Sequence, residues 1–135
     1  SNNNMSNKMD KILAEISVGE LIDKITILEI KKEKILSKEK LVDINKELKS
    51  LNETMKKYIP DQEEILSYKN DLKNINAKLW EIEDGKRSAE KNNQFDEKFI
   101  QLARNVYKFN DERAKIKLAI NNALGSNIKE VKSYE

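Results

Sequence analysis

The sequence contains no cysteine and no histidine. It therefore excludes disulfides, thiolate and imidazole metal sites, and the Cys–His or Ser–His arrangements that activate a nucleophile. No apolar run approaches the roughly 18 residues of a transmembrane helix, and no secretory signal is visible. We expect a cytoplasmic protein with no membrane contact and no cofactor, although a carboxylate site for Mg²⁺ remains open.

Turn-forming residues are also scarce, and neither positive nor negative charge is in clear excess. The chain has three glycines and one proline, whereas a sheet protein needs a turn about every eight to twelve residues. Hydrophobic residues make up 38% and charged residues 37%, so the core must consist of thin apolar stripes on helices. The 26 basic and 24 acidic side chains are interspersed, which makes nucleic acid an unlikely partner.

Apolar residues recur at helical spacing in three stretches that two turns separate. Pro60 ends the first stretch, "KNNQFDEKF" separates the second from the third, and Gly125 ends the third. Ser17 with Glu20, and Asp61 with Glu64, have the spacing of capping boxes at helix starts. The pattern predicts an all-α fold, an antiparallel three-helix bundle resembling a coiled coil.

We divide the chain into three parts. Residues 17–125 form the helical bundle domain, residues 1–16 a flexible N-terminal segment whose start can be a tag, and residues 126–135 a C-terminal tail. Gly85, inside the second helical stretch, costs about 1 kcal/mol against alanine, so we expect fraying or bending there.

The apolar periodicity of the first helical stretch does not fix its length. Its apolar seam over 21–35 is out of phase with the seam over 41–58, and the break falls at Ser37–Lys40. Because no glycine or proline stands there, a kink is favoured over a reversal, and continuity through this segment stays open. A continuous helix would measure about 60 Å against about 45 Å for the other two. The excess length suggests packing on a second copy or another protein.

Polar residues of the second and third helical stretches match across the predicted hairpin. If the turn lies near residue 93, facing residues have numbers that sum to about 186. Such pairs can fix the register of the helices, or they can line a polar cleft that binds a ligand. The candidate ligand-binding residues of this cleft are Trp80, Glu83, Arg87, Arg104, Tyr107, Asn110 and Arg113.

Two cations, Lys32 and Arg113, stand where the seams require an apolar residue. A buried charge without a partner costs several kcal/mol, so each must extend to solvent, pair with an acid or face an anionic ligand. The predicted acidic partners are Glu29 and Glu33 for Lys32. For Arg113 they are Asp111 or an acid on the first helix, such as Glu47.

One enzyme class stays open. The helical chorismate mutases, which the predicted bundle resembles, hold a dicarboxylate with Arg and Lys and need no histidine. Lys24, Lys32, Arg104 and Arg113 would form the clamp. However, the paired arginines that this family carries on its first helix are missing, since no arginine precedes Arg87.

Three motifs resemble a small bacterial and phage family known only as a domain of unknown function. They are "ISVGELIDKITILEIKKEKI" (16–35), "LWEIED" (79–84) and "FDEKFIQLARNVYKFNDERAKIKLAINNALGS" (95–126). The resemblance covers most of residues 16–134 and departs at Gly85, where a helix former would be expected. It implies an association with surface-polysaccharide and glycosyltransferase genes, but no catalytic residue.

The expected function is that of a non-catalytic helical interaction or oligomerisation protein, whose expected partner is a second copy or another protein. The alternative is a small-molecule or anion-binding protein that uses the polar cleft for a phosphate or a nucleotide-sugar-like ligand. That alternative could link the chain to surface-polysaccharide biosynthesis. Whether the chain is an enzyme is left open.

Overall fold

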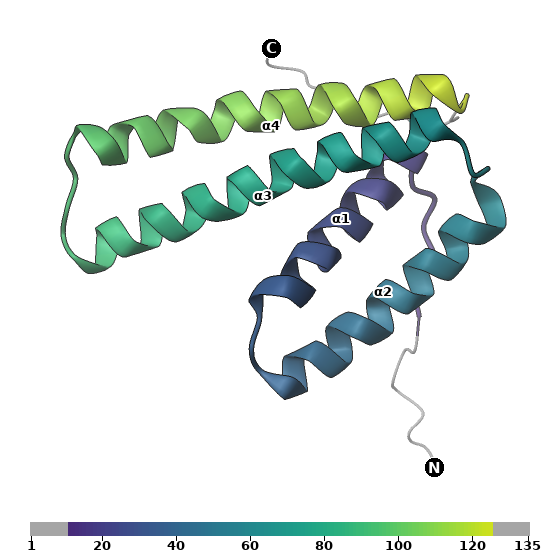
Figure 1. The fold of residues 1–135 in the computed structure, drawn as a ribbon, viewed down its shortest axis with the longest axis horizontal. Coiled ribbons are helices and arrows are strands. Elements are labelled where there is room, and N and C mark those ends of the chain that lie inside the picture. The colour runs from purple at the N-terminus through teal and green to yellow at the C-terminus, as the bar shows by residue number, and fades with distance from the viewer. Residues whose placement is uncertain (1–10, 126–135) are drawn as a thin grey trace.

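The computed structural model describes residues 11–125, and these contain four helices and no strand. The helices are α1 (Val18–Lys34), α2 (Lys38–Tyr58), α3 (Glu63–Lys91) and α4 (Glu97–Ala123). They form two antiparallel hairpins, α1 with α2 and α3 with α4 (Figure 1). The predicted all-α class is confirmed, and the predicted count of three helices is wrong. The tail, 126–135, and residues 1–10 lie outside the described part.

The predicted long first helix is in fact α1 and α2, joined by a reversal. Ile35 has extended backbone angles, with φ −85° and ψ 130°, and ends α1. Ser37 then caps α2 by accepting a hydrogen bond from the Lys40 amide at 3.4 Å. Because this connection needs no left-handed residue, the absence of glycine did not prevent the turn. The likeness to chorismate mutases, which relied on a long first helix, loses its basis.

Helix boundaries follow the predicted caps in part. The amide of Glu20 donates to Ser17 Oγ at 3.1 Å, so the predicted cap of the first helix is confirmed. Asp61 does not cap α3, because that helix begins after Gln62, which makes no side-chain capping bond. Gly125 has a φ of 62° directly after the end of α4, as expected for a glycine that stops a helix.

The core centres on α1, which packs against the other three helices. Ile22 and Ile25 of α1 are fully buried, together with Leu72 of α3 and Ile120 of α4. From Val18 to Lys31, every residue of α1 except Lys24 is buried or half-buried, because three helices pack around it. Any polar side chain on α1 that points inward must therefore find its partner inside the protein.

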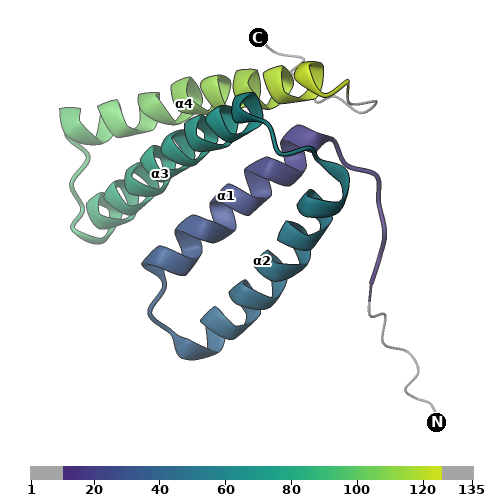
Figure 2. The same cartoon turned by 45° about the vertical axis from the view of Figure 1, so that its right-hand side comes forward.

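The α3/α4 hairpin is longer than the core requires. With 29 and 27 residues, α3 and α4 measure about 44 and 41 Å, whereas the 17 residues of α1 span about 26 Å. The half of the hairpin nearest its turn projects past α1 and α2 (Figures 1 and 2). We call this projecting half the arm, and the inside corner between the arm and α1 the elbow.

The register of α3 against α4 is close to the predicted one. Lys78 Nζ lies 5.2 Å from the ring centroid of Phe109, and Gly85 packs against Leu102. The residue numbers of both pairs sum to 187, against the predicted 186 or so. Helix α3 continues through Gly85 without a break, so the expected fraying is absent. The missing side chain instead lets Leu102 approach, since a Cβ there would lie 3.0 Å from its Cδ1.

Ion pairs join the exposed edges of α1 and α3. Lys73 Nζ lies 2.7 Å from Glu33 Oε2, and Lys34 Nζ lies 3.0 Å from Glu81 Oε1. The hydrogen bond and charge of Lys73 lower the pKa of Glu33, and Glu81 raises the pKa of Lys34 in the same way. These exposed pairs orient the α1/α2 hairpin against α3, but each contributes little to stability.

The Glu33 pair makes a prediction about pH. A lowered folded-state pKa means that the pair stabilises the fold above the ordinary pKa of 4.5 and is lost as the pH falls through the folded value. The Glu33 carboxyl should therefore titrate below 4.5 in an NMR pH titration, and Lys73→Ala should move its midpoint back towards 4.5. An unchanged midpoint in the variant would contradict the pairing.

Candidate ligand-binding cleft at the elbow

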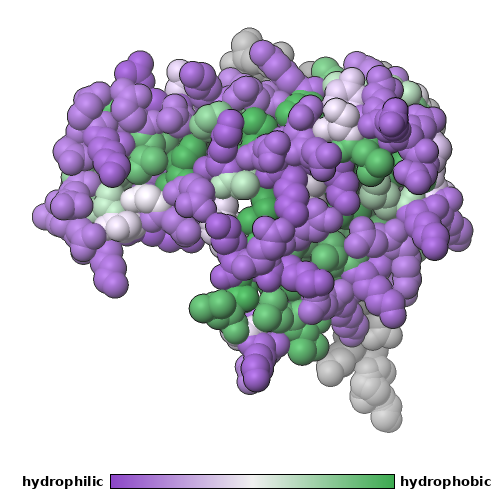
Figure 3. All heavy atoms as spheres, in the orientation of Figure 1, coloured by the Kyte–Doolittle hydropathy of each residue, from purple (hydrophilic) through white to green (hydrophobic). Residues whose placement is uncertain are grey.

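A cleft of about 320 Å³ lies at the elbow, between the C-terminal half of α1 and the two helices of the arm. The surface is hollowed at this corner, where the arm leaves the α1/α2 hairpin (Figure 3). We call it the elbow cleft. Its lining consists of Ile27, Ile30, Asn76, Leu79, Trp80, Glu83, Asp84, Arg87, Val106, Asn110 and Arg113.

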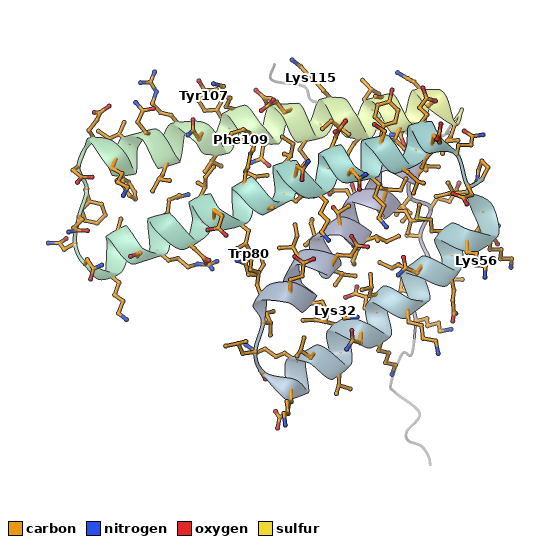
Figure 4. All side chains as sticks on the ribbon, viewed as in Figure 1. Lys32, Lys56, Trp80, Tyr107, Phe109 and Lys115 are labelled. Atoms are coloured by element: carbon orange, nitrogen blue, oxygen red, sulfur yellow. The ribbon has the colours of Figure 1, made fainter. Side chains whose placement is uncertain are left out.

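Apolar side chains form a large part of this lining. Ile27 and Ile30 come from α1, Leu79 and Trp80 from α3, and Val106 from α4. Trp80 is half-buried and points from α3 towards the C-terminal end of α1 (Figure 4). Its ring offers a broad apolar surface with one polar N–H, a combination that is common where proteins bind ligands.

Charged side chains of both signs also line the cleft. Glu83, Asp84 and Arg87 follow Trp80 on α3 within two turns, and Arg113 comes from α4 at the other end of the cleft. Lys86 holds the Glu83 carboxylate at 3.4 Å. The lining thus combines two guanidinium groups with two carboxylates, so it offers both hydrogen-bond donors and acceptors and little net charge.

Arg113 is held in place by a buried carboxylate beneath the cleft. Its Nε donates to Asp23 Oδ1 at 2.9 Å, and its Nη2 donates to Asp23 Oδ2 at 2.5 Å. The Asp23 side chain is 1% exposed, whereas that of Arg113 is 28% exposed. A two-point bond of this kind fixes the plane of the guanidinium, so Arg113 presents its outer edge to the cleft in one orientation.

Asparagine side chains complete the network around Asp23. Asn76 Nδ2 donates to Asp23 Oδ1 and to Thr26 Oγ1, each at 2.9 Å, and Thr26 donates to the Asp23 carbonyl at 2.8 Å. On the other side, Arg113 Nη1 makes a long 3.5 Å contact with Asn110 Oδ1. The network joins α1, α3 and α4 at the floor of the elbow cleft.

The predicted alternative that Arg113 pairs with an acid of the first helical stretch is confirmed. Arg113 pairs with an acid on the first helix, but with Asp23 rather than Glu47, which binds Lys24 at 3.0 Å. The missed signal was that Asp23 lies among the apolar residues Leu21, Ile22 and Ile25, so that a buried Asp23 needs an internal cation.

Lys32 is exposed, as one of its predicted alternatives required. The two acids predicted to pair with it bind lysines of α3 instead. Lys69 lies 3.1 Å from Glu29, and Lys73 lies 2.7 Å from Glu33. Lys32 therefore reaches solvent from the outer side of α1, next to α2 (Figure 4).

Five of the seven residues predicted for the cleft come together in it: Trp80, Glu83, Arg87, Asn110 and Arg113. Tyr107 does not, because it is 64% exposed and points away from α3 on the outer side of α4 (Figure 4). Arg104 is exposed too and is absent from the lining. The predicted hairpin could not show which of its sides faces α1, and the cleft exists only on that side.

The described residues show neither a metal centre nor a membrane span. Within residues 11–125, no group of three acidic side chains is placed so that it could hold a metal ion. In the same range, no helix combines the length and the apolar character needed to cross a bilayer.

A family match covers almost the whole chain. The model of a family of unknown function, DUF6165, matches residues 12–135. The chain belongs to this family. The resemblance predicted from the three motifs is thereby confirmed as membership of a family of unknown function. Neither the curated proteins nor the solved structures contain a significant match. The DUF6165 match includes the α1, α3 and α4 segments that build the elbow cleft.

Proposed function

We propose that this chain is a binding protein that holds a small polar ligand in the elbow cleft, the ligand having a flat apolar face and an anionic group. One observation carries the proposal: Trp80 and two arginines line the same cleft, and one of them, Arg113, is fixed from below by Asp23. A preoriented donor loses little freedom on binding, so more of its interaction appears as affinity.

Each part of the lining has a role in this proposal. The Trp80 ring packs against the flat face of the ligand. Arg87 at one end of the cleft and the outer edge of Arg113 at the other each offer hydrogen-bond donors to an anionic group. Glu83 and Asp84 accept hydrogen bonds from hydroxyl groups, for which the cleft has room. A nucleotide-sugar-like molecule carries all three of these features, and a simple phosphate carries only one.

Binding can be tested by thermal-shift screening against nucleotides, nucleotide sugars and phosphorylated metabolites, followed by calorimetry on each hit. We expect Trp80→Ala and Arg87→Ala each to weaken binding by about tenfold or more. Lys98→Ala is the matched control, because Lys98 is an exposed cation of α4 outside the cleft, and it should leave the affinity unchanged.

Two outcomes would contradict this proposal. The first is the absence of any hit in the three ligand classes. The second is a hit whose affinity neither Trp80→Ala nor Arg87→Ala changes. If Arg87→Ala abolishes binding while Trp80→Ala does not, the cleft binds an anionic group alone. The ligand would then need no flat apolar face.

We propose, secondly, that the protein self-associates. The specific support is α4, whose side facing away from α3 carries exposed apolar residues, among them Tyr107 (Figure 4). A long overhanging first helix does not support self-association, because the first helical stretch folds as two separate helices, α1 and α2. Light scattering over a range of concentrations tests the proposal, and a strict monomer would remove it.

A further inference from the structure

One face of α4 carries large apolar side chains that no other helix covers. Ile100 is 46% exposed, Tyr107 64% and Leu118 38%. The spacings between them are seven and eleven residues, which are close to two and three whole turns of an α-helix. The three side chains therefore lie on one side of α4, and Tyr107 points away from α3 on that side (Figure 4).

The residues between them complete a regular stripe, which we call the outer α4 seam. Its spacings alternate between four and three residues, the pattern of a helix that pairs with another helix. The outer α4 seam consists of Ile100, Arg104, Tyr107, Asp111, Ala114 and Leu118.

We propose that the outer α4 seam binds the same seam of a second copy, with the two α4 helices antiparallel about a twofold axis. This inference rests on the self-association proposed above and gives it an interface. A twofold interface uses one surface on both subunits, so the seam must be complementary to itself.

An antiparallel register makes the outer α4 seam complementary to itself. When residue numbers that face each other sum to 218, Ile100 packs on the partner's Leu118, and Tyr107 meets the partner's Asp111. The remaining layer sets Arg104 against the partner's Ala114. Every residue of the seam then has a facing residue, and the twofold axis repeats each layer. The outermost layers are apolar and the central ones polar, which fixes the register.

Charge decides between the antiparallel and the parallel arrangement. The partner's Ala114 is small, so the Arg104 guanidinium can extend one turn further to the carboxylate of the partner's Asp111. The symmetry gives two such pairs. In a parallel pairing in register, Arg104 would face Arg104 and Asp111 would face Asp111, and like charges face to face oppose association.

The expected affinity is modest. The seam extends over 19 residues, with about 27 Å between its ends, so the interface is at the small end of specific interfaces. Lys108 flanks the seam near the twofold axis and would approach the same lysine of the partner, which weakens the pairing further. We therefore expect a dimer that dissociates in the micromolar range and that a concentration series can follow.

The decisive experiment uses two charge reversals, separately and mixed, in analytical ultracentrifugation. Arg104→Asp alone brings two carboxylates together at each pair, and Asp111→Arg alone brings two guanidinium groups together. Each variant should self-associate at least about tenfold more weakly than the wild type. A mixture of the two should form a heterodimer in which both pairs are again opposite in charge.

Independent variants guard against misfolding. Ile100→Lys should weaken the dimer as well, whereas Lys98→Ala, on the opposite side of α4, should not. Circular dichroism melts check that each variant is folded. A wild type that stays monomeric at every concentration overturns both self-association and this interface. A dimer that Arg104→Asp and Ile100→Lys leave unchanged, or charge variants that do not pair on mixing, overturns the interface and leaves self-association standing.

Discussion

Replacing Asp23 by alanine should lower the free energy of unfolding by about 3–5 kcal/mol. The variant removes a fully buried carboxylate that accepts two hydrogen bonds from Arg113 and one from Asn76. The guanidinium of Arg113, whose side chain is 28% exposed, would lose its main internal acceptor while remaining partly out of water. Urea denaturation followed by circular dichroism measures the change.

Two further variants make this result interpretable. Asp43→Ala is the matched control, because Asp43 is an exposed acid of α2, and it should change the stability by less than about 0.5 kcal/mol. In the double variant Asp23→Leu with Arg113→Met both charges are removed, and much of the lost stability should return. A loss below about 1 kcal/mol for Asp23→Ala would show that the buried pair contributes little.

Gly19→Ala should be the second most damaging single substitution, at about 2–4 kcal/mol. The added Cβ would lie 2.5 Å from the Lys117 carbonyl oxygen and 3.0 Å from Asn121 Oδ1. Because the first of these atoms belongs to the backbone of α4, the start of α1 must move away. That movement breaks the buried 2.7 Å hydrogen bond from the Gly19 amide to Asn121.

Gly85→Ala is the matched control for this effect. There the added Cβ would meet the far end of the half-buried Leu102 side chain, at 3.0 Å, and that side chain can rotate. The gain in helix propensity is about 1 kcal/mol, so the variant should lie within about 1 kcal/mol of the wild type. Equal denaturation midpoints for the two alanine variants would contradict the tight contact of α1 with α4.

Sequence periodicity predicted the helical class, the α3/α4 hairpin and its register. It failed at Ile35–Ser37, because a helix can end and restart through extended residues and a serine cap without glycine or proline. The change of phase between the two apolar seams was the signal of the reversal. It indicated that a second helix, α2, begins there and turns its own apolar side towards the core. The covering of α1 by three helices depends on contacts distant in sequence, which local patterns do not contain.

The sequence predicted some, but not all, of the residues that line the elbow cleft. Trp80 was identified because polar and aromatic residues matched across two antiparallel helices, and Arg113 because it is a cation at an apolar seam position. Arg104 and Tyr107 matched equally well, but they lie on the side of the arm that α1 does not reach. Asp23 was missed because its role follows from the burial of α1 and not from the spacing of its own neighbours.

The bond between Gly19 and Asn121 joins positions 102 residues apart. It has a consequence for synthesis on the ribosome. The α1/α2 hairpin can form early from local contacts, but the side of α1 that carries Gly19 has no cover until the last turns of α4 have been made. The nascent chain must therefore keep the apolar face of α1 soluble through most of its translation. The many lysines and glutamates of α2, the helix made directly after α1, can help to keep the hairpin soluble during that time.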